Sequence, residues 1–216
     1  MKKYQAVIFD LDGTLLNTLE DLKSAVNHTM SALNCPLRTL NEVKSFVGDG
    51  IQKLLERSLP EGKKSDVGRA YFIFCEYYVA HNSEKTTPYA GMVSLVSCLK
   101  EKGVKLSVVT NKADFAAKAL CQKFFGDAFT AVIGARDNLP RKPQPNGVNE
   151  ALALMGVAAQ RALYIGDSEV DFETARAAGI DCVLVGWGFR DKSLLTALKP
   201  FAVVDEVGKL EKIILK

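Results

Sequence analysis

The stretch YQAVIFDLDGTL, residues 4–15, decides the fold that this chain is expected to adopt. Its apolar run Ala6–Phe9 predicts a short strand that is buried on both faces. Asp10 and Asp12 follow that strand at once, and open α/β sheets bind ligands just outside the carboxyl ends of their strands. A carboxylate held there can coordinate a hard cation or attack an electrophile. Two carboxylates at this spacing can also divide the work, one as nucleophile and the other as proton donor and acceptor.

The composition of the chain argues against several classes of protein. Its 216 residues and 48% hydrophobic content suit one buried core, or a core with a smaller inserted domain. A net charge of +3 without any run of Lys and Arg argues against a nucleic-acid partner. No stretch approaches the ~20 apolar residues that cross a bilayer and no signal peptide is evident, so we expect no membrane association. Five scattered cysteines without CxxC spacing predict reduced thiols and a cytoplasmic location.

Strand-like and helical patterns alternate along most of the chain. The apolar runs that predict strands are Ala6–Phe9, Leu106–Val109, Ala131–Ile133, Ala162–Ile165 and Cys182–Val185. Helical patterns lie between them, at Met92–Lys102, Phe115–Phe124, Pro145–Met155 and Asp171–Ala178. This alternation predicts an α/β core, a Rossmann-like, doubly wound parallel sheet covered by helices.

One interval, residues 18–88, interrupts the alternation. It contains no convincing strand, and turn-like segments divide it into four helical patterns, Leu19–Leu33, Leu40–Phe46, Ile51–Leu59 and Val67–His81. We therefore expect a small all-helical domain over residues 18–88, inserted into a core domain made of residues 1–17 and 89–216. A helical insert placed directly after the first strand could act as a lid.

Further polar residues stand at the ends of the later strands. Thr110 and Asn111 close one strand, Lys142 precedes a proline-started helix, and Asp167 and Asp171 follow another strand. In a parallel sheet these positions meet at one edge. Unit charges 4 Å apart repel by about 4 kcal/mol at an effective dielectric of about 20, so the converging carboxylates need a cation. Mg²⁺ suits such a site, because it uses few carboxylates together with a substrate phosphate. The site therefore looks built for transfer of a phosphoryl group to a carboxylate.

These residues resemble the four motifs of the haloacid dehalogenase superfamily. Asp10–Thr14 is similar to the first motif, Thr110-Asn111 to the second, Lys142-Pro143 to the third and Gly166–Asp171 to the fourth. Each motif is weak alone, but all four in order are highly specific. The helical insert resembles the family's cap domain, which lies between the first and second motifs.

The resemblance implies a role for each aspartate. Asp10 would be the nucleophile that forms an aspartyl-phosphate, and Asp12 would protonate the leaving alcohol and then activate water. Asp10, the backbone carbonyl of Asp12, and Asp167 would hold Mg²⁺, with Asp171 supporting the site. The aspartate at position 12 also separates phosphatases from the carbon–halogen and carbon–phosphorus hydrolases of the superfamily, which lack it.

The remaining motif residues are implied to bind substrate. Thr110, Asn111 and Lys142 would hold the phosphoryl group of a small phosphorylated metabolite. Looser segments are most similar to phosphoglycolate phosphatases, so 2-phosphoglycolate is the first substrate to consider. Asn17 departs from that pattern, in which Asp is usual, but Asn caps a helix equally well.

Other functions remain open on the sequence alone. A phosphosugar mutase would use the same chemistry, a pyrophosphatase or nucleotidase would differ in substrate, and a non-catalytic binding module would have kept only the fold. The protein could be a monomer or a homodimer.

Overall fold

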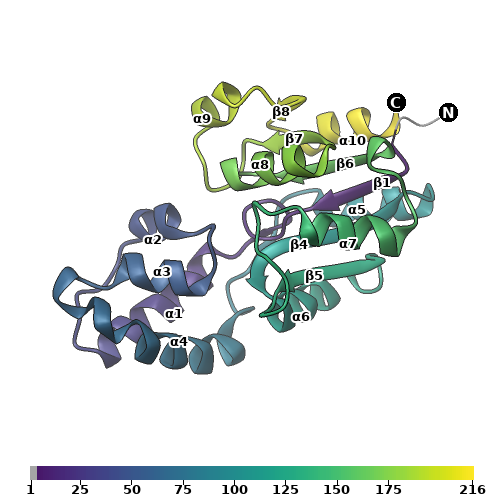
Figure 1. The fold of residues 1–216 in the computed structure, drawn as a ribbon. Helices are drawn as coiled ribbons and strands as arrows, with labels where there is room; N and C mark the ends of the chain where they lie inside the picture. The colour runs from purple at the N-terminus through teal and green to yellow at the C-terminus, as the bar shows by residue number, and fades with distance from the viewer. Residues whose placement is uncertain (1–3) are drawn as a thin grey trace. The chain divides into compact units, whose positions relative to one another are not determined.

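A computed structural model describes residues 4–216, and the chain divides into two compact units (Figure 1). The first unit combines the residues up to Leu16 with Pro88–Lys216, and the second is Asn17–Thr87. The insert was expected over residues 18–88. The two chain connections between the units, β2 (Leu16–Asn17) and β3 (Thr87–Pro88), pair with each other as a two-stranded sheet.

The first unit is built on a six-stranded sheet whose strand order is β5-β4-β1-β6-β7-β8. Every neighbouring pair in it is parallel, which confirms the predicted α/β class. The strands are β1 (Ala6–Phe9), β4 (Lys105–Ala113), β5 (Ala131–Ala135), β6 (Ala162–Gly166), β7 (Asp181–Val185) and β8 (Ala202–Val204).

The central strand β1 is fully buried because both of its faces are covered by helices. Val7 and Phe9 face a cluster supplied by α5 (Met92–Glu101), α6 (Asp114–Phe125) and α10 (Val207–Leu215). Ala6 and Ile8 face the opposite cluster, which is supplied by α7 (Asn146–Met155), α8 (Glu169–Ala178) and α9 (Lys192–Ala197). The unbroken apolar run of β1 is therefore explained by burial on two sides.

The structure adds elements that the sequence patterns do not predict. Strand β4 continues through Ala113, so Thr110 and Asn111 lie inside the strand and not behind its end. Beyond Val185 the chain forms α9, β8 and α10, and a short 3₁₀ helix covers Ala159–Arg161. The apolar run of β8 is only three residues long, and a run of that length is too short to stand out.

The second unit is all-helical, as predicted. Its helices are α1 (Leu19–Ala32), α2 (Leu40–Phe46), α3 (Ile51–Ser58), the 3₁₀ helix Glu61–Asp66 and α4 (Val67–His81). The buried Asp21 on α1 ties the end of this unit to its start, because its carboxylate accepts the backbone N–H groups of Lys85 and Thr86. Within residues 4–216, no helix has both the length and the apolar character needed to cross a membrane.

Candidate active site

Asp10 stands at the carboxyl end of the central strand of the sheet. Its backbone N–H donates to the carbonyl oxygen of Ile165 at 2.8 Å, which continues the pairing of β1 with β6 by one residue. The chain then turns sharply through Gly13, which has a φ of +87°. A Cβ at Gly13 would overlap the carboxylate of Asp167, so this position needs glycine for both its conformation and its space. The turn thus brings the end of β1 against the end of β6.

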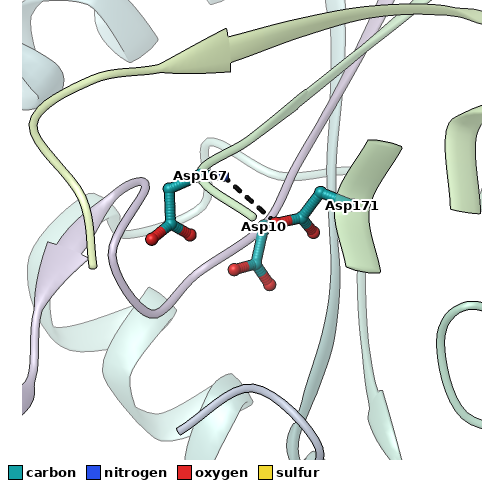
Figure 2. Close-up of side chains that lie close together, drawn as sticks. All are labelled: Asp10, Asp167 and Asp171. Carbon is teal, nitrogen blue, oxygen red and sulfur yellow. Dashed lines mark hydrogen bonds between the residues drawn. The ribbon is translucent and has the colours of Figure 1, made fainter. Parts of the chain in front are cut away.

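Three buried carboxylates meet at this point. Oxygen atoms of Asp10, Asp167 and Asp171 lie within 4.8 Å of one another. Figure 2 shows the three side chains close together, with Asp171 in the first turn of α8. Asp167 comes directly after β6, and its two oxygens accept the backbone N–H of Phe189 at 2.7 Å and the hydroxyl of Thr14 at 3.3 Å. The sheet edge therefore concentrates negative charge in one place, as the sequence predicts.

Asp171 belongs to the acidic cluster and also caps its own helix, α8. Its Oδ2 accepts the backbone N–H groups of Asp167 and Ser168, both at 3.1 Å, and the Ser168 hydroxyl at 2.7 Å. The Ser168 side chain in turn accepts the N–H of Asp171, which completes a capping box at the first turn of α8. The other oxygen of Asp171, Oδ1, accepts hydrogen bonds from Lys142 Nζ and from the Tyr164 hydroxyl. Asp171 Oδ2 accepts three protein donors and Oδ1 faces two more, whereas each oxygen of Asp167 accepts one, so Asp171 suits an anchoring role better than a metal-ligand role.

Lys142 brings a buried positive charge into the cluster. Its Nζ lies 2.8 Å from Asp10 Oδ1, 2.6 Å from Asp171 Oδ1 and 3.1 Å from the Tyr164 hydroxyl. Three partners match the three N–H donors of an ammonium group. The backbone of Lys142 is also fixed, since Asn111 Oδ1 accepts its N–H at 2.9 Å and Asn111 Nδ2 donates to its carbonyl at 3.1 Å. The Asn111 side chain thus clamps the segment that carries the lysine.

The crowding shifts the pKa values of the cluster. Burial raises the pKa of Asp10 to about 7, with a further upward contribution from Asp171 and an opposing one from Lys142. Burial and the charges of Asp171 and Asp10 raise the pKa of Asp167 well above its ordinary value. Burial would lower the pKa of Lys142, but the charges of Asp10 and Asp171 hold it well above its usual value. One ammonium faces three carboxylates, so the site has negative charge left for a cation to balance.

The donor set fits a hard divalent cation. Asp10 and Asp167 both offer carboxylate oxygens, and both have pKa values that show a cost of holding unbalanced charge. Oxygen ligands from two carboxylates, completed by water or substrate, are the arrangement that Mg²⁺ adopts in proteins. The acidic cluster can therefore hold a metal ion.

Asp12 lies outside this cluster and has a partner of its own. The Nζ of Lys112 approaches Asp12 Oδ1 at 3.0 Å and Oδ2 at 3.3 Å. Thr110, two residues before Lys112 in β4, accepts the N–H of Lys112 on its hydroxyl oxygen at 3.3 Å. That contact leaves the hydroxyl hydrogen of Thr110 for another acceptor, such as a phosphoryl oxygen.

Three features of the site were missed on the sequence. Lys112 directly follows the second motif, and nothing in its spacing to Asp12 signals a pair. Tyr164 reads as one more apolar strand residue, yet its hydroxyl contacts Lys142 and lies 3.1 Å from the Val109 carbonyl. Gly188 reads as a loop glycine, although a Cβ there would overlap Asp167. None of these three contacts leaves a local pattern, because each joins residues far apart in the chain.

A parallel α/β sheet with an acidic cluster at the end of its central strand defines the class of this protein. The chain belongs to the haloacid dehalogenase-like hydrolase family, whose model matches residues 7–185. A phosphoglycolate phosphatase of Pseudomonas putida is 34% identical over 212 residues, covering 94% of this chain and 77% of the relative. One from Mesorhizobium japonicum is 32% identical over 209 residues, covering 94% and 92%.

Solved structures give the same picture. A provisionally assigned phosphoglycolate phosphatase from Lactobacillus delbrueckii subsp. bulgaricus superposes with a TM-score of 0.93 at 34% identity, covering 100% of this chain and 99% of that one. The protein CbbY of Rhodobacter sphaeroides, solved with phosphate, superposes with a TM-score of 0.73 at 21% identity, which is a likeness of fold alone. The superfamily resemblance drawn from the four motifs is confirmed.

Proposed function

We propose that this protein is a Mg²⁺-dependent phosphatase that hydrolyses a small phosphate monoester, with 2-phosphoglycolate as the first candidate substrate. The observation that carries the proposal is the placement of Asp10. It ends the central strand, contacts a buried lysine at 2.8 Å and shares a cluster with Asp167. A carboxylate so held can act as a nucleophile.

The proposed reaction has two steps that use two aspartates. A carboxylate oxygen of Asp10 attacks phosphorus, the bond from phosphorus to the ester oxygen breaks, and Asp12 gives its proton to the leaving alkoxide. Asp12, now a carboxylate, takes a proton from water as the water oxygen attacks the aspartyl-phosphate. The bond from phosphorus to Asp10 then breaks, inorganic phosphate leaves, and both aspartates return to their starting states.

The other site residues are assigned to binding and support. Thr110 and Lys142 would hold phosphoryl oxygens. Lys142 contacts Asp10 directly, and Thr110 lies on β4, the strand that pairs with β1, which supports that assignment. We assign Asn111 to holding the Lys142 backbone, because both polar atoms of its side chain face that backbone. Asp171 would keep Lys142 and the first turn of α8 in place.

Mg²⁺ would be held by Asp10, Asp167 and, from the family resemblance, the backbone carbonyl of Asp12. When bound, it would balance the charge of the cluster and of the incoming phosphoryl group. Metal-dependent stabilisation of the protein is the simplest sign of this binding.

The substrate assignment rests on the relatives and not on the site. Relatives at 32–34% identity carry the name phosphoglycolate phosphatase, whereas the residues around Asp10 would serve any phosphate monoester. We propose that the helical unit Asn17–Thr87 is a cap that selects the substrate. Pyrophosphate, nucleotides and sugar phosphates therefore belong in the same test.

The decisive experiment measures phosphate release from a panel of esters with and without Mg²⁺. The panel should contain 2-phosphoglycolate, pyrophosphate, a nucleoside monophosphate and hexose phosphates. Asp10→Asn should abolish release while leaving the fold intact, and retained turnover would contradict the nucleophile assignment. Transfer of phosphate between sugar positions without release would indicate a mutase. Ligand binding without release from any ester would indicate a non-catalytic module.

A further inference from the structure

Each of the two aspartates in the loop after β1 has its own buried lysine. Lys142 Nζ lies 2.8 Å from Asp10 Oδ1, and Lys112 Nζ lies 3.0 Å from Asp12 Oδ1. Lys142 lies in the segment before α7, whereas Lys112 lies in strand β4. Two carboxylates only two residues apart are thus held by separate cations.

The pair of Lys112 and Asp12 is shielded from water. The Lys112 side chain is 4% exposed and that of Asp12 is 14% exposed. Lysine is almost never buried without a partner, because desolvating an ammonium group is costly. Lys112 lies within strand β4, in the stretch between Val109 and Ala113 where the pairing with β5 shifts register, and not in a loop. A charge fixed in this way can determine where the facing carboxylate points.

The position of the Asp12 carboxylate relative to the acidic cluster decides which chemistry it can perform. Among residues 4–216, the carboxylates that gather within 4.8 Å of one another are those of Asp10, Asp167 and Asp171, and Asp12 is not one of them. A second loop carboxylate inside that cluster would become one more ligand or one more repelling charge. Outside it, the carboxylate stays paired with Lys112, whose Nζ faces both of its oxygens, and does not become a further member of the acidic cluster.

We propose that Lys112 is a positioning residue that holds the Asp12 carboxylate outside the acidic cluster. In that position Asp12 exchanges protons with the leaving group and with water. The inference rests on the proposed function, because it assigns Lys112 to the proton-transfer step of that reaction. Lys112 acts through Asp12 and does not bind substrate.

This role predicts a dependence on the leaving group. An alkyl ester such as 2-phosphoglycolate releases a strongly basic alkoxide, so its first step needs the proton of Asp12. The ester p-nitrophenyl phosphate releases a stable phenolate, so its first step proceeds without that proton. Hydrolysis of the aspartyl-phosphate needs Asp12 as a base for both substrates. Misplacing Asp12 should therefore slow both formation and hydrolysis of the aspartyl-phosphate when the substrate is 2-phosphoglycolate. With p-nitrophenyl phosphate it should slow only the hydrolysis.

The test compares Lys112→Met, Asp12→Asn and the double variant with the wild type on both esters. Lys112→Met should lower kcat for 2-phosphoglycolate by about 10- to 100-fold, part of the 10²–10⁴ that general acid–base catalysis supplies, with KM almost unchanged. Rapid mixing with p-nitrophenyl phosphate should give a burst of about one nitrophenolate per enzyme and then slow turnover. The double variant should be no slower than Asp12→Asn alone, because Lys112 acts only through Asp12. Lys112→Arg should restore part of kcat.

Several results would overturn the inference. A raised KM with unchanged kcat would make Lys112 a substrate-binding residue, and multiplicative losses in the double variant would show that it acts independently of Asp12. Full activity of Lys112→Met would show that Lys112 has no role in the reaction. Lys100→Met is the matched control, because Lys100 is 46% exposed and pairs with Asp127 on the surface. If Lys112→Met does not fold, Lys112→Gln is judged by the same burst and the same double variant. A wild type that releases phosphate from no ester would refute the proposed function itself, which separates the two failures.

Discussion

Lys142 Nζ lies 2.8 Å from Asp10 Oδ1, although 132 positions separate the two residues in the chain. The same ammonium also contacts Asp171 at 2.6 Å, so one buried cation serves two buried carboxylates. Its raised pKa keeps it charged throughout the physiological range. Lys142 is therefore needed both for the stability of the acidic cluster and for the proposed chemistry.

Replacing Lys142 by Met should therefore be strongly destabilising. Breaking a buried ion pair by removing one partner costs about 3–5 kcal/mol, because the remaining charge is left uncompensated. The loss should be smaller at acid pH, where the carboxyl group of Asp10, whose pKa is raised to about 7 by burial, binds a proton. Urea unfolding at two pH values checks this, with Lys100→Met as a surface control that should change stability little. An equal loss at both pH values would contradict the electrostatic explanation.

Stabilisation by Mg²⁺ should increase with pH. The pKa of Asp10 is raised by burial from 3.8, the ordinary value of an aspartate, to about 7 in the folded protein, so the folded state binds this proton more tightly. That contribution to stability is fully present below about pH 4 and is lost as the pH rises through about 7. Mg²⁺ competes with the proton, so the rise in Tm that it causes should be larger at about pH 8 than at about pH 5.5.

The same melting experiment contains its own control. At a hundredfold excess over its dissociation constant, a ligand stabilises the folded state by about 2.7 kcal/mol. In Asp10→Asn, which has no carboxyl group to titrate, the rise in Tm with Mg²⁺ should be smaller and should vary less with pH. A rise that is independent of pH in the wild type would place the metal away from Asp10.

Gly188→Ala should damage the site without disturbing the sheet. A Cβ at Gly188 would overlap the side chain of Asp167, so that carboxylate must move. We expect weaker Mg²⁺ binding and at least tenfold lower kcat, an effect of about 1.4 kcal/mol or more on the barrier. Gly208→Ala is the matched control, because a Cβ there meets nothing within 4 Å and Gly208 lies in helix α10. Titration of Mg²⁺ by the change in Tm distinguishes the two variants.

Tyr164→Phe should lower stability more than activity. The Tyr164 hydroxyl contacts Lys142, Asp171 and the Val109 carbonyl, and the side chain is fully buried. Removing it leaves buried polar groups without a partner, which costs about 1–3 kcal/mol. Lys142 keeps its contacts with both aspartates, so kcat should fall only a few-fold. Loss of activity comparable with that of Asp10→Asn, in a folded variant, would give the phenol a direct part in the reaction.

The fold and the meeting of aspartates at one edge of the sheet could be predicted from the sequence, because both depend on local patterns. The run Ala6–Phe9 is strand β1 with the same bounds, since an apolar run buried on two faces is easily recognised. The helical patterns Leu40–Phe46 and Val67–His81 are also found with those bounds. The aspartates after β1 and β6 could be placed together because parallel strands end at one edge.

What could not be predicted depends on contacts between distant residues. The pairing of Lys112 with Asp12 joins positions 100 apart, and Lys112 lies where the pairing of β4 with β5 shifts register. The Asn111 side chain could face phosphate or protein on sequence grounds, and only the position of the Lys142 backbone distinguishes the two. The double use of Asp171, as helix cap and as partner of Lys142, likewise appears only when α8 and the lysine segment are both in place.

The central position of β1 also has a consequence for how the protein is made. Val7 pairs with Leu106 of β4 and with Leu163 of β6, so β1 is synthesised before both of its neighbours. Until they are synthesised, its apolar edge and faces stay unpaired, which exposes the nascent chain to aggregation. The second unit, whose helices are contiguous in sequence, can form during that delay. Chaperone demand during synthesis should therefore end only after β6 has emerged.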